Sequence, residues 1–161
     1  MRASRKLLVI GGLLLSIWGM SYGLYYALLI EHQTLETIGS SLATSFASAS
    51  QRKMDASRVN LESYALACFD YARQVDVHSH WIGLGILLVS LGVIFNRVSF
   101  GERLRFLLAL ALLIGSAVFP LGVMWQTMDR GPGPRVLASV GAALVTSALA
   151  GVAIGFVRAR E

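Results

Sequence analysis

Long apolar runs alternate with short polar stretches along the chain. Crossing about 30 Å of hydrocarbon takes roughly 20 mostly apolar residues in an α-helix. Four runs indicate such helices: residues 7–30, 81–95, 104–128 and 136–157. The second run is short, so its helix must begin in the preceding segment. The remaining residues would form a cytoplasmic N-terminus (1–6), an extracytoplasmic segment (31–80), a cytoplasmic loop (96–103), an outer turn (129–135) and a cytoplasmic C-terminus (158–161).

The segment 31–80 is more polar but still follows a helical period, because apolar residues recur every three or four positions. The first stripe comprises Leu35, Ile38, Leu42, Phe46 and Ala49, and the second comprises Leu61, Tyr64, Cys68, Tyr71 or Ala72, and Val75. We expect two antiparallel helices that continue the first two spans, with Asp55 as an N-cap. The stripes would face each other or a partner. The candidate partner contacts are Leu61, Tyr64, Cys68 and Val75.

The predicted fold is therefore all-α and membrane-integral. It is an up-down bundle of four transmembrane helices with a projecting extracytoplasmic helical hairpin. Only 14% of the 161 residues are charged and the mean hydropathy is +0.64, whereas soluble domains have about 25% charged residues. This composition excludes a soluble globule. It also excludes a nucleic-acid-binding module despite the net charge of +5, because the basic residues follow membrane topology.

Lysine and arginine set the expected orientation, because they concentrate in the cytoplasmic flanks of membrane spans. Eight lie before the first span, around the second connection or after the last span: Arg2, Arg5, Lys6, Arg97, Arg103, Arg105, Arg158 and Arg160. Arg130 and Arg135 lie in the short third connection. We expect a protein integral to the bacterial cytoplasmic membrane, with both termini cytoplasmic and the lipid bilayer around its spans.

Small residues inside the spans indicate helix packing. They recur at every fourth position as Gly19 and Gly23 in the first span and as Ser147, Gly151 and Gly155 in the fourth. Such faces let helix backbones approach closely, either within one bundle or between subunits. Pro120 lies midway through the third span and is expected to kink it.

The single cysteine, Cys68, leaves two interpretations open. It is a buried structural thiol, or it forms a disulfide with another chain, since a lone cysteine cannot make an internal one.

The three histidines are the sharpest chemical feature. His32 follows the first span by two residues, and His78 and His80 come just before the second. The hairpin would bring them to one layer, with Glu31 and Asp76 as acidic neighbours. On an unbroken helix, His78 and His80 are about 200° apart. We expect His78 to face the bundle near His32 and His80 to point away. These side chains are candidate ligands for Zn, Cu or haem b; hydrogen-bonded interfacial histidines or a partner contact are the alternatives.

The sequence Val75-Asp76-Val77-His78-Ser79-His80-Trp81-Ile82-Gly83-Leu84-Gly85 resembles the His-x-His helix start of small uncharacterised bacterial four-helix membrane proteins. It is more distantly similar to a helix of the nitric-oxide-reductase and haem–copper-oxidase subunit I group. The resemblance implies a bound haem or metal, or an origin in that group. It does not imply catalysis, because only His32 is available as a further histidine ligand.

Two functions follow as expectations. The first is a non-catalytic accessory or scaffolding subunit of a larger respiratory, photosynthetic or envelope complex, with other membrane subunits as partners. It is supported by the small-residue faces, the hairpin and the absence of a catalytic motif or an intramembrane carboxylate. The second is a haem- or metal-binding membrane redox protein, supported by the histidines alone.

Overall fold

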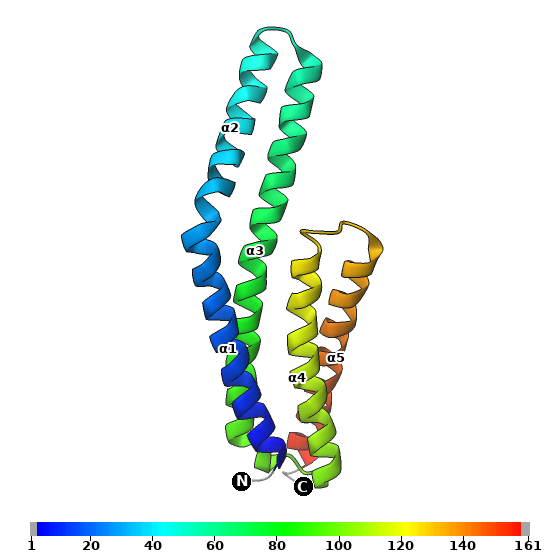
Figure 1. Cartoon of the computed structure of the whole chain (residues 1–161). Helices are drawn as coiled ribbons and strands as arrows, with labels where there is room; N and C mark the ends of the chain where they lie inside the picture. Colours follow the sequence, from blue (N-terminus) through cyan, green and yellow to red (C-terminus); the bar gives the residue numbers. More distant parts are fainter. Residues whose placement is uncertain (1–2, 159–161) are drawn as a thin grey trace. The chain divides into compact units, whose positions relative to one another are not determined.

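The computed structural model describes residues 3–158, and within them the secondary structure is helical (Figure 1). The α-helices are α1 (Ala3–Leu29), α2 (Glu31–Ser50), α3 (Met54–Ile94), α4 (Glu102–Trp125) and α5 (Pro132–Val157), and a short 3-10 helix, η1 (Phe95–Arg97), follows α3. Four segments are long and apolar enough to cross a membrane: α1, α3 with η1, α4 and α5. The predictions of an all-α fold and of four membrane-length helices are confirmed.

The helix boundaries differ from the sequence predictions at two connections. Helix α3 begins at Met54, so Asp55 lies in its first turn and is not the N-cap. There a carboxylate favours the helix through its positive dipole end. Helix α5 begins at Pro132, inside the stretch expected to form a turn. Proline suits this first position because its missing N–H would have no partner within the helix and its φ is already helical.

Contacts divide the chain into two compact units. Among the described residues, one unit contains 3–21 and 76–158, and the other contains 22–75. Helices α1 and α3 each contribute to both units, whereas α4 and α5 belong to the first and α2 to the second. The two units are described separately below.

Glycines bring α1 against α3 in the first unit. A Cβ atom added to Gly85 would lie 2.6 Å from the carbonyl oxygen of Gly12, and one added to Gly19 would lie 2.8 Å from the Cβ of Trp81. Since the lower-numbered part of α1 meets the higher-numbered part of α3, the two helices are antiparallel. Even an alanine at Gly85 would force the backbones apart.

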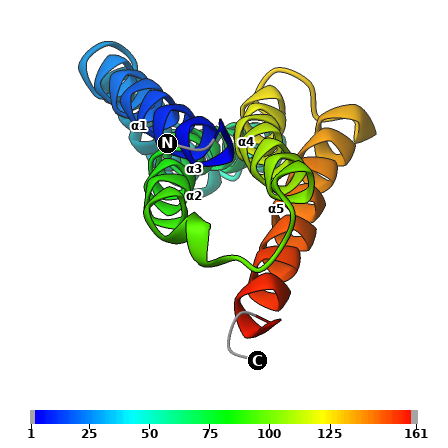
Figure 2. The same ribbon diagram turned by 90° about the horizontal axis from the view of Figure 1, so that it is seen from below.

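Helices α4 and α5 pair in the same way, and Figure 2 shows this pair beside α1 and α3. A Cβ atom added to Gly141 would lie 2.5 Å from the backbone nitrogen of Phe119, and one added to Gly122 would lie 2.4 Å from that of Ala138. The core of this unit combines such small residues with larger apolar ones. It contains Leu8, Leu88, Phe95, Val98, Ala109, Leu112, Val145, Ala148 and Val152.

One end of the first unit is held together by polar contacts. The hydroxyl of Ser4 at the start of α1 donates to Glu102 at the start of α4, over 2.9 Å. The backbone N–H of Ser99 donates to the carbonyl oxygen of Gly155 near the end of α5, over 2.9 Å. The loop between η1 and α4 therefore lies close to the end of α5, and the start of α4 lies beside the start of α1.

In the second unit, α2 packs antiparallel against the first part of α3 through serines. Ser45 is 6% exposed, and its hydroxyl donates to the carbonyl oxygen of Ser57 over 3.0 Å while lying 3.1 Å from the Ser57 hydroxyl. The hydroxyls of Ser41 and Ser63 lie 3.4 Å apart. The apolar stripe predicted for residues 35–49 is thus only part of this contact, because a small polar side chain, Ser45, lies at the centre of the contact.

Candidate functional site

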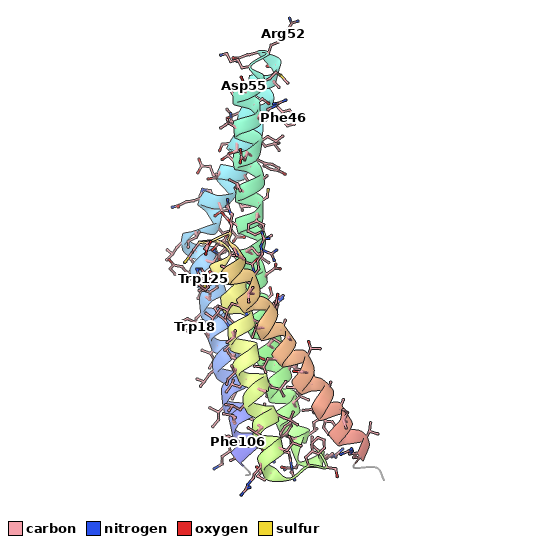
Figure 3. The ribbon with its side chains drawn as sticks, turned by 90° about the vertical axis from the view of Figure 1, so that its right-hand side faces the viewer. Trp18, Phe46, Arg52, Asp55, Phe106 and Trp125 are labelled. Carbon is pink, nitrogen blue, oxygen red and sulfur yellow. The ribbon has the colours of Figure 1, made fainter. Side chains whose placement is uncertain are left out.

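The serine contact leaves large apolar side chains on the surface of the second unit. Phe46 follows buried Ser45 and is 69% exposed, and it points away from the helix pair (Figure 3). Leu35 is 47% exposed and Leu61 is 50% exposed, and Met54 at the start of α3 is 58% exposed. The pairing of the two helices therefore leaves these four large apolar residues uncovered.

These side chains lie on one side of the pair. Successive residues of an α-helix are about 100° apart, which places Phe46 about 100° and Leu35 about 80° from Ser45 in the same rotational sense. On α3, Leu61 and Met54 lie about 60° and 80° from half-buried Tyr64, again in that sense.

The hydrogen bond between Ser41 and Ser63 marks the other side of the pair, because both serines are rotated in the opposite sense. For antiparallel helices, equal senses of rotation lead to the same side of the pair. We call Leu35, Phe46, Met54 and Leu61 the exposed apolar face.

Tyr64, Cys68 and Val75, which were predicted as partner contacts, are half-buried. A hydrogen bond with the Cys68 thiol raises the pKa of the Tyr64 phenol. Of the predicted contact residues, Leu61 alone lies on the exposed apolar face. Sequence periodicity did not separate these positions, because residues at the edge and at the centre of one stripe share the same spacing.

The structure corrects the predicted orientation of His80. Its ring lies 4.8 Å from the ring of Phe119 on α4, at an angle of 40°, so it faces a neighbouring helix within the first unit. His78 is also half-buried, and its carbonyl oxygen lies 3.1 Å from the position of a Cβ on Gly19 in α1. Helix α3 therefore has neighbours on two sides: its backbone at His78 lies against α1, and the His80 ring lies against α4.

Glu31 and His32 belong to the second unit. The phenol of Tyr71 donates to the Glu31 carboxylate over 3.1 Å, and this hydrogen bond raises the pKa of Tyr71. His32 is exposed in the first turn of α2, whereas Asp76 is half-buried on α3 in the first unit. Glu31 therefore has a tyrosine as its partner, and the expected proximity of His32 to His78 stays a prediction.

The predicted ligand residues do not form a metal-binding cluster in residues 3–158. Within this range, no group of three or more histidine, cysteine, aspartate or glutamate side chains could hold a metal ion. Haem ligation, which needs one or two axial ligands, stays a prediction.

The small residues predicted to pack helices have different surroundings. Gly19 lies against Trp81, Gly151 faces the side chain of Leu108, and Gly155 faces Val98 and Phe100. Gly23 is half-buried on the part of α1 that belongs to the second unit.

Ser147 is exposed and donates to the carbonyl oxygen of Leu144 in its own helix, over 3.1 Å. It therefore takes no part in packing within the chain. The buried stripe of α5 instead runs through Gly141, Val145, Ala148, Val152 and Gly155.

Pro120 is buried in α4, which continues as one helix from Glu102 to Trp125. Because proline has no N–H, the carbonyl of Ser116 lacks its usual partner four residues later. The Ser116 hydroxyl is also buried without a hydrogen-bond partner in the described part of the chain. This region adjoins Phe119, which contacts both His80 and the backbone of Gly141.

Comparisons of the chain with protein-family models, curated proteins and solved structures found no match.

Proposed function

We propose that the chain is a non-catalytic integral subunit of the bacterial cytoplasmic membrane. In this role it is an accessory or scaffold of a larger membrane complex, and its exposed apolar face binds another protein subunit. The observation that supports the proposal is the serine contact between α2 and α3, which leaves Phe46 and Leu61 at the surface.

The proposed topology makes this face significant. With both termini in the cytoplasm, the proposed topology has α2 and the first part of α3 on the outer side of the membrane. There the exposed apolar face contacts water, whereas exposed apolar residues of the spans contact lipid. Burying apolar area is favourable from water but gives little driving force between helices in lipid.

The free energy gained by burying the exposed apolar face is large enough for a protein–protein contact. Full burial of a leucine, phenylalanine or methionine side chain contributes roughly 1.5–3 kcal/mol. Covering the four side chains of the exposed apolar face, each about half exposed, would contribute on the order of 5 kcal/mol. Such a gain supports a specific interface when the rim adds polar contacts.

The test is a set of single substitutions in the full chain, expressed in its native membrane. Phe46→Asp and Leu61→Asp should dissociate a subunit that co-purifies in fixed stoichiometry, because a carboxylate cannot be buried in an apolar interface without a partner. Leu66→Asp is the matched control, since Leu66 is 38% exposed but lies about 160° from Tyr64 around α3. It should leave the complex intact.

Circular dichroism should show unchanged helix content in all three variants. A complex that survives both Phe46→Asp and Leu61→Asp would contradict the proposal, as would equal loss with Leu66→Asp.

A further inference from the structure

An apolar groove runs between α1 and α4 in the first unit. Its volume is about 390 Å³, and its lining includes Lys6, Ile10, Gly11 and Leu14 from α1 and Phe106 and Leu113 from α4. Phe106 lies toward the end of α4 that is nearer the start of α1 (Figure 3). The lining of α1 extends from Ala3 to Leu14, which are eleven residues apart, so the groove follows α1 for about 16 Å. This length is close to the roughly 15 Å depth of one hydrocarbon leaflet.

Gly11 lets α4 pack closely against α1 beside the groove. A Cβ atom added to Gly11 would lie 2.6 Å from a methyl carbon of Leu113, so a larger side chain at this position would push Leu113 into the groove or separate the helices. Ile10 and Leu14 lie one turn apart on the neighbouring face of α1, where they are 56% and 62% exposed. Between these side chains and α4, the groove fits a hydrocarbon chain of a lipid.

A positive charge lies near one end of the groove. Among the described residues that line the groove, Lys6 carries this charge, and it is exposed. Around this end, the Nε of Arg5 and an Nη of Arg105 are buried without a hydrogen-bond partner in the described residues. Glu102 is the nearby acidic group, and its carboxylate already accepts from the hydroxyl of Ser4.

We infer that the groove is a binding site for an anionic phospholipid. One acyl chain lies along Ile10 and Leu14, and the headgroup phosphate lies at Lys6. A helix of a partner protein fits the space less well, because a 16 Å length of helix about 10 Å wide occupies on the order of 1,300 Å³. The inference requires only that α1 and α4 span the bilayer, and it does not depend on the proposed partner subunit.

The experiment measures lipid retention by native mass spectrometry of the full chain. The protein is extracted from vesicles that contain equal amounts of phosphatidylglycerol and phosphatidylethanolamine. Wild type should retain one phosphatidylglycerol in preference to phosphatidylethanolamine. Lys6→Gln should reduce that preference about fivefold, the equivalent of the roughly 1 kcal/mol contributed by one basic residue at an anionic membrane surface. Arg97→Gln, which removes an exposed cation of η1 outside the groove, should leave the preference unchanged.

Gly11→Leu should abolish retention of either lipid, because the new side chain pushes Leu113 into the groove. Gly83→Leu is the control, since no atom lies within 4 Å of a Cβ at that position of α3. If Gly11→Leu lowers helix content, Lys6→Gln against Arg97→Gln decides the question alone. Equal retention of the two lipids by wild type, or equal loss in Lys6→Gln and Arg97→Gln, would overturn the inference. A mass spectrum in which the chain retains a protein and no lipid would also overturn the inference.

Discussion

The hydroxyl of Ser45 donates to the carbonyl oxygen of Ser57 across the α2–α3 contact, at a distance of 3.0 Å. Ser45→Ala should destabilise this pair by about 1 kcal/mol, the usual net contribution of such a hydrogen bond. Ser45→Leu should cost more, because its side chain would force the helices apart. Denaturant titration followed by circular dichroism measures both effects. Ser40→Ala is the control, since the exposed Ser40 hydroxyl bonds only within α2; a loss equal to that of Ser45→Ala would argue against the serine contact.

The glycine contact between α1 and α3 predicts opposite effects for two neighbouring positions. Gly85→Ala should destabilise the bundle by about 1–3 kcal/mol, because the added Cβ would lie 2.3 Å from the Ser16 hydroxyl. Gly83→Ala should be neutral or slightly stabilising, because its site is open and alanine favours a helix more than glycine does. Unfolding in mixed micelles measures the difference. Equal stability of the two variants would mean that α1 and α3 are farther apart.

The Tyr71–Glu31 hydrogen bond, at the start of α2, predicts that folding stability depends on pH. Its effect is to raise the pKa of Tyr71 in the folded chain, so the protonated phenol is favoured by folding. The contribution is therefore complete at neutral pH and is lost as the pH rises through the folded-state pKa. Phenolate absorbance should reveal this late titration beside that of Tyr64, whose pKa is also raised, and Tyr71→Phe should remove the Tyr71 component.

Glu31→Gln should shift the Tyr71 titration to lower pH, because the amide accepts a hydrogen bond but has no charge. A phenolate titration that is the same with and without the Glu31 carboxylate would show that the contact does not form in solution.

His80→Ala should destabilise the first unit by about 1 kcal/mol, because it removes a ring that contacts Phe119 and ring pairs contribute about 0.5–1.5 kcal/mol. His32→Ala should have little effect on stability, since His32 is exposed. Thermal unfolding of the two variants in one detergent compares them. The opposite ranking would place His80 away from α4.

Membrane topology can be tested independently of packing. In a Cys68→Ala background, a cysteine at Arg52 should react with an impermeant maleimide added outside the cell. A cysteine at Arg97 should react only after the membrane is opened. Both side chains are exposed, so accessibility reports the side of the membrane. The reverse pattern would invert the proposed orientation.

Apolar run length was sufficient to predict the four membrane-length helices, because the thickness of the hydrocarbon fixes the length of a span. It did not predict how α2 and α3 meet. A periodic stripe indicates which residues share a helix face, but Ser45 lies at the contact because a small side chain permits close approach and its hydroxyl finds a partner. Helical geometry predicted that His78 and His80 lie on different faces of α3. It could not show that α3 has neighbours on two sides, so His80 was expected to point away and instead lies against Phe119.

The small side chains between α2 and α3 also determine how this pair responds to temperature. Heat capacity rises on unfolding in proportion to the apolar area exposed and falls with the polar area exposed. Separating helices whose contact centres on Ser45 and Ser57 exposes hydroxyl groups and half-buried residues such as Ile38 and Leu42, whereas Phe46 and Leu61 are exposed already. The opening equilibrium of the pair should therefore have a smaller heat-capacity change than that of a leucine-rich coiled coil of equal length, and its free energy should curve less with temperature.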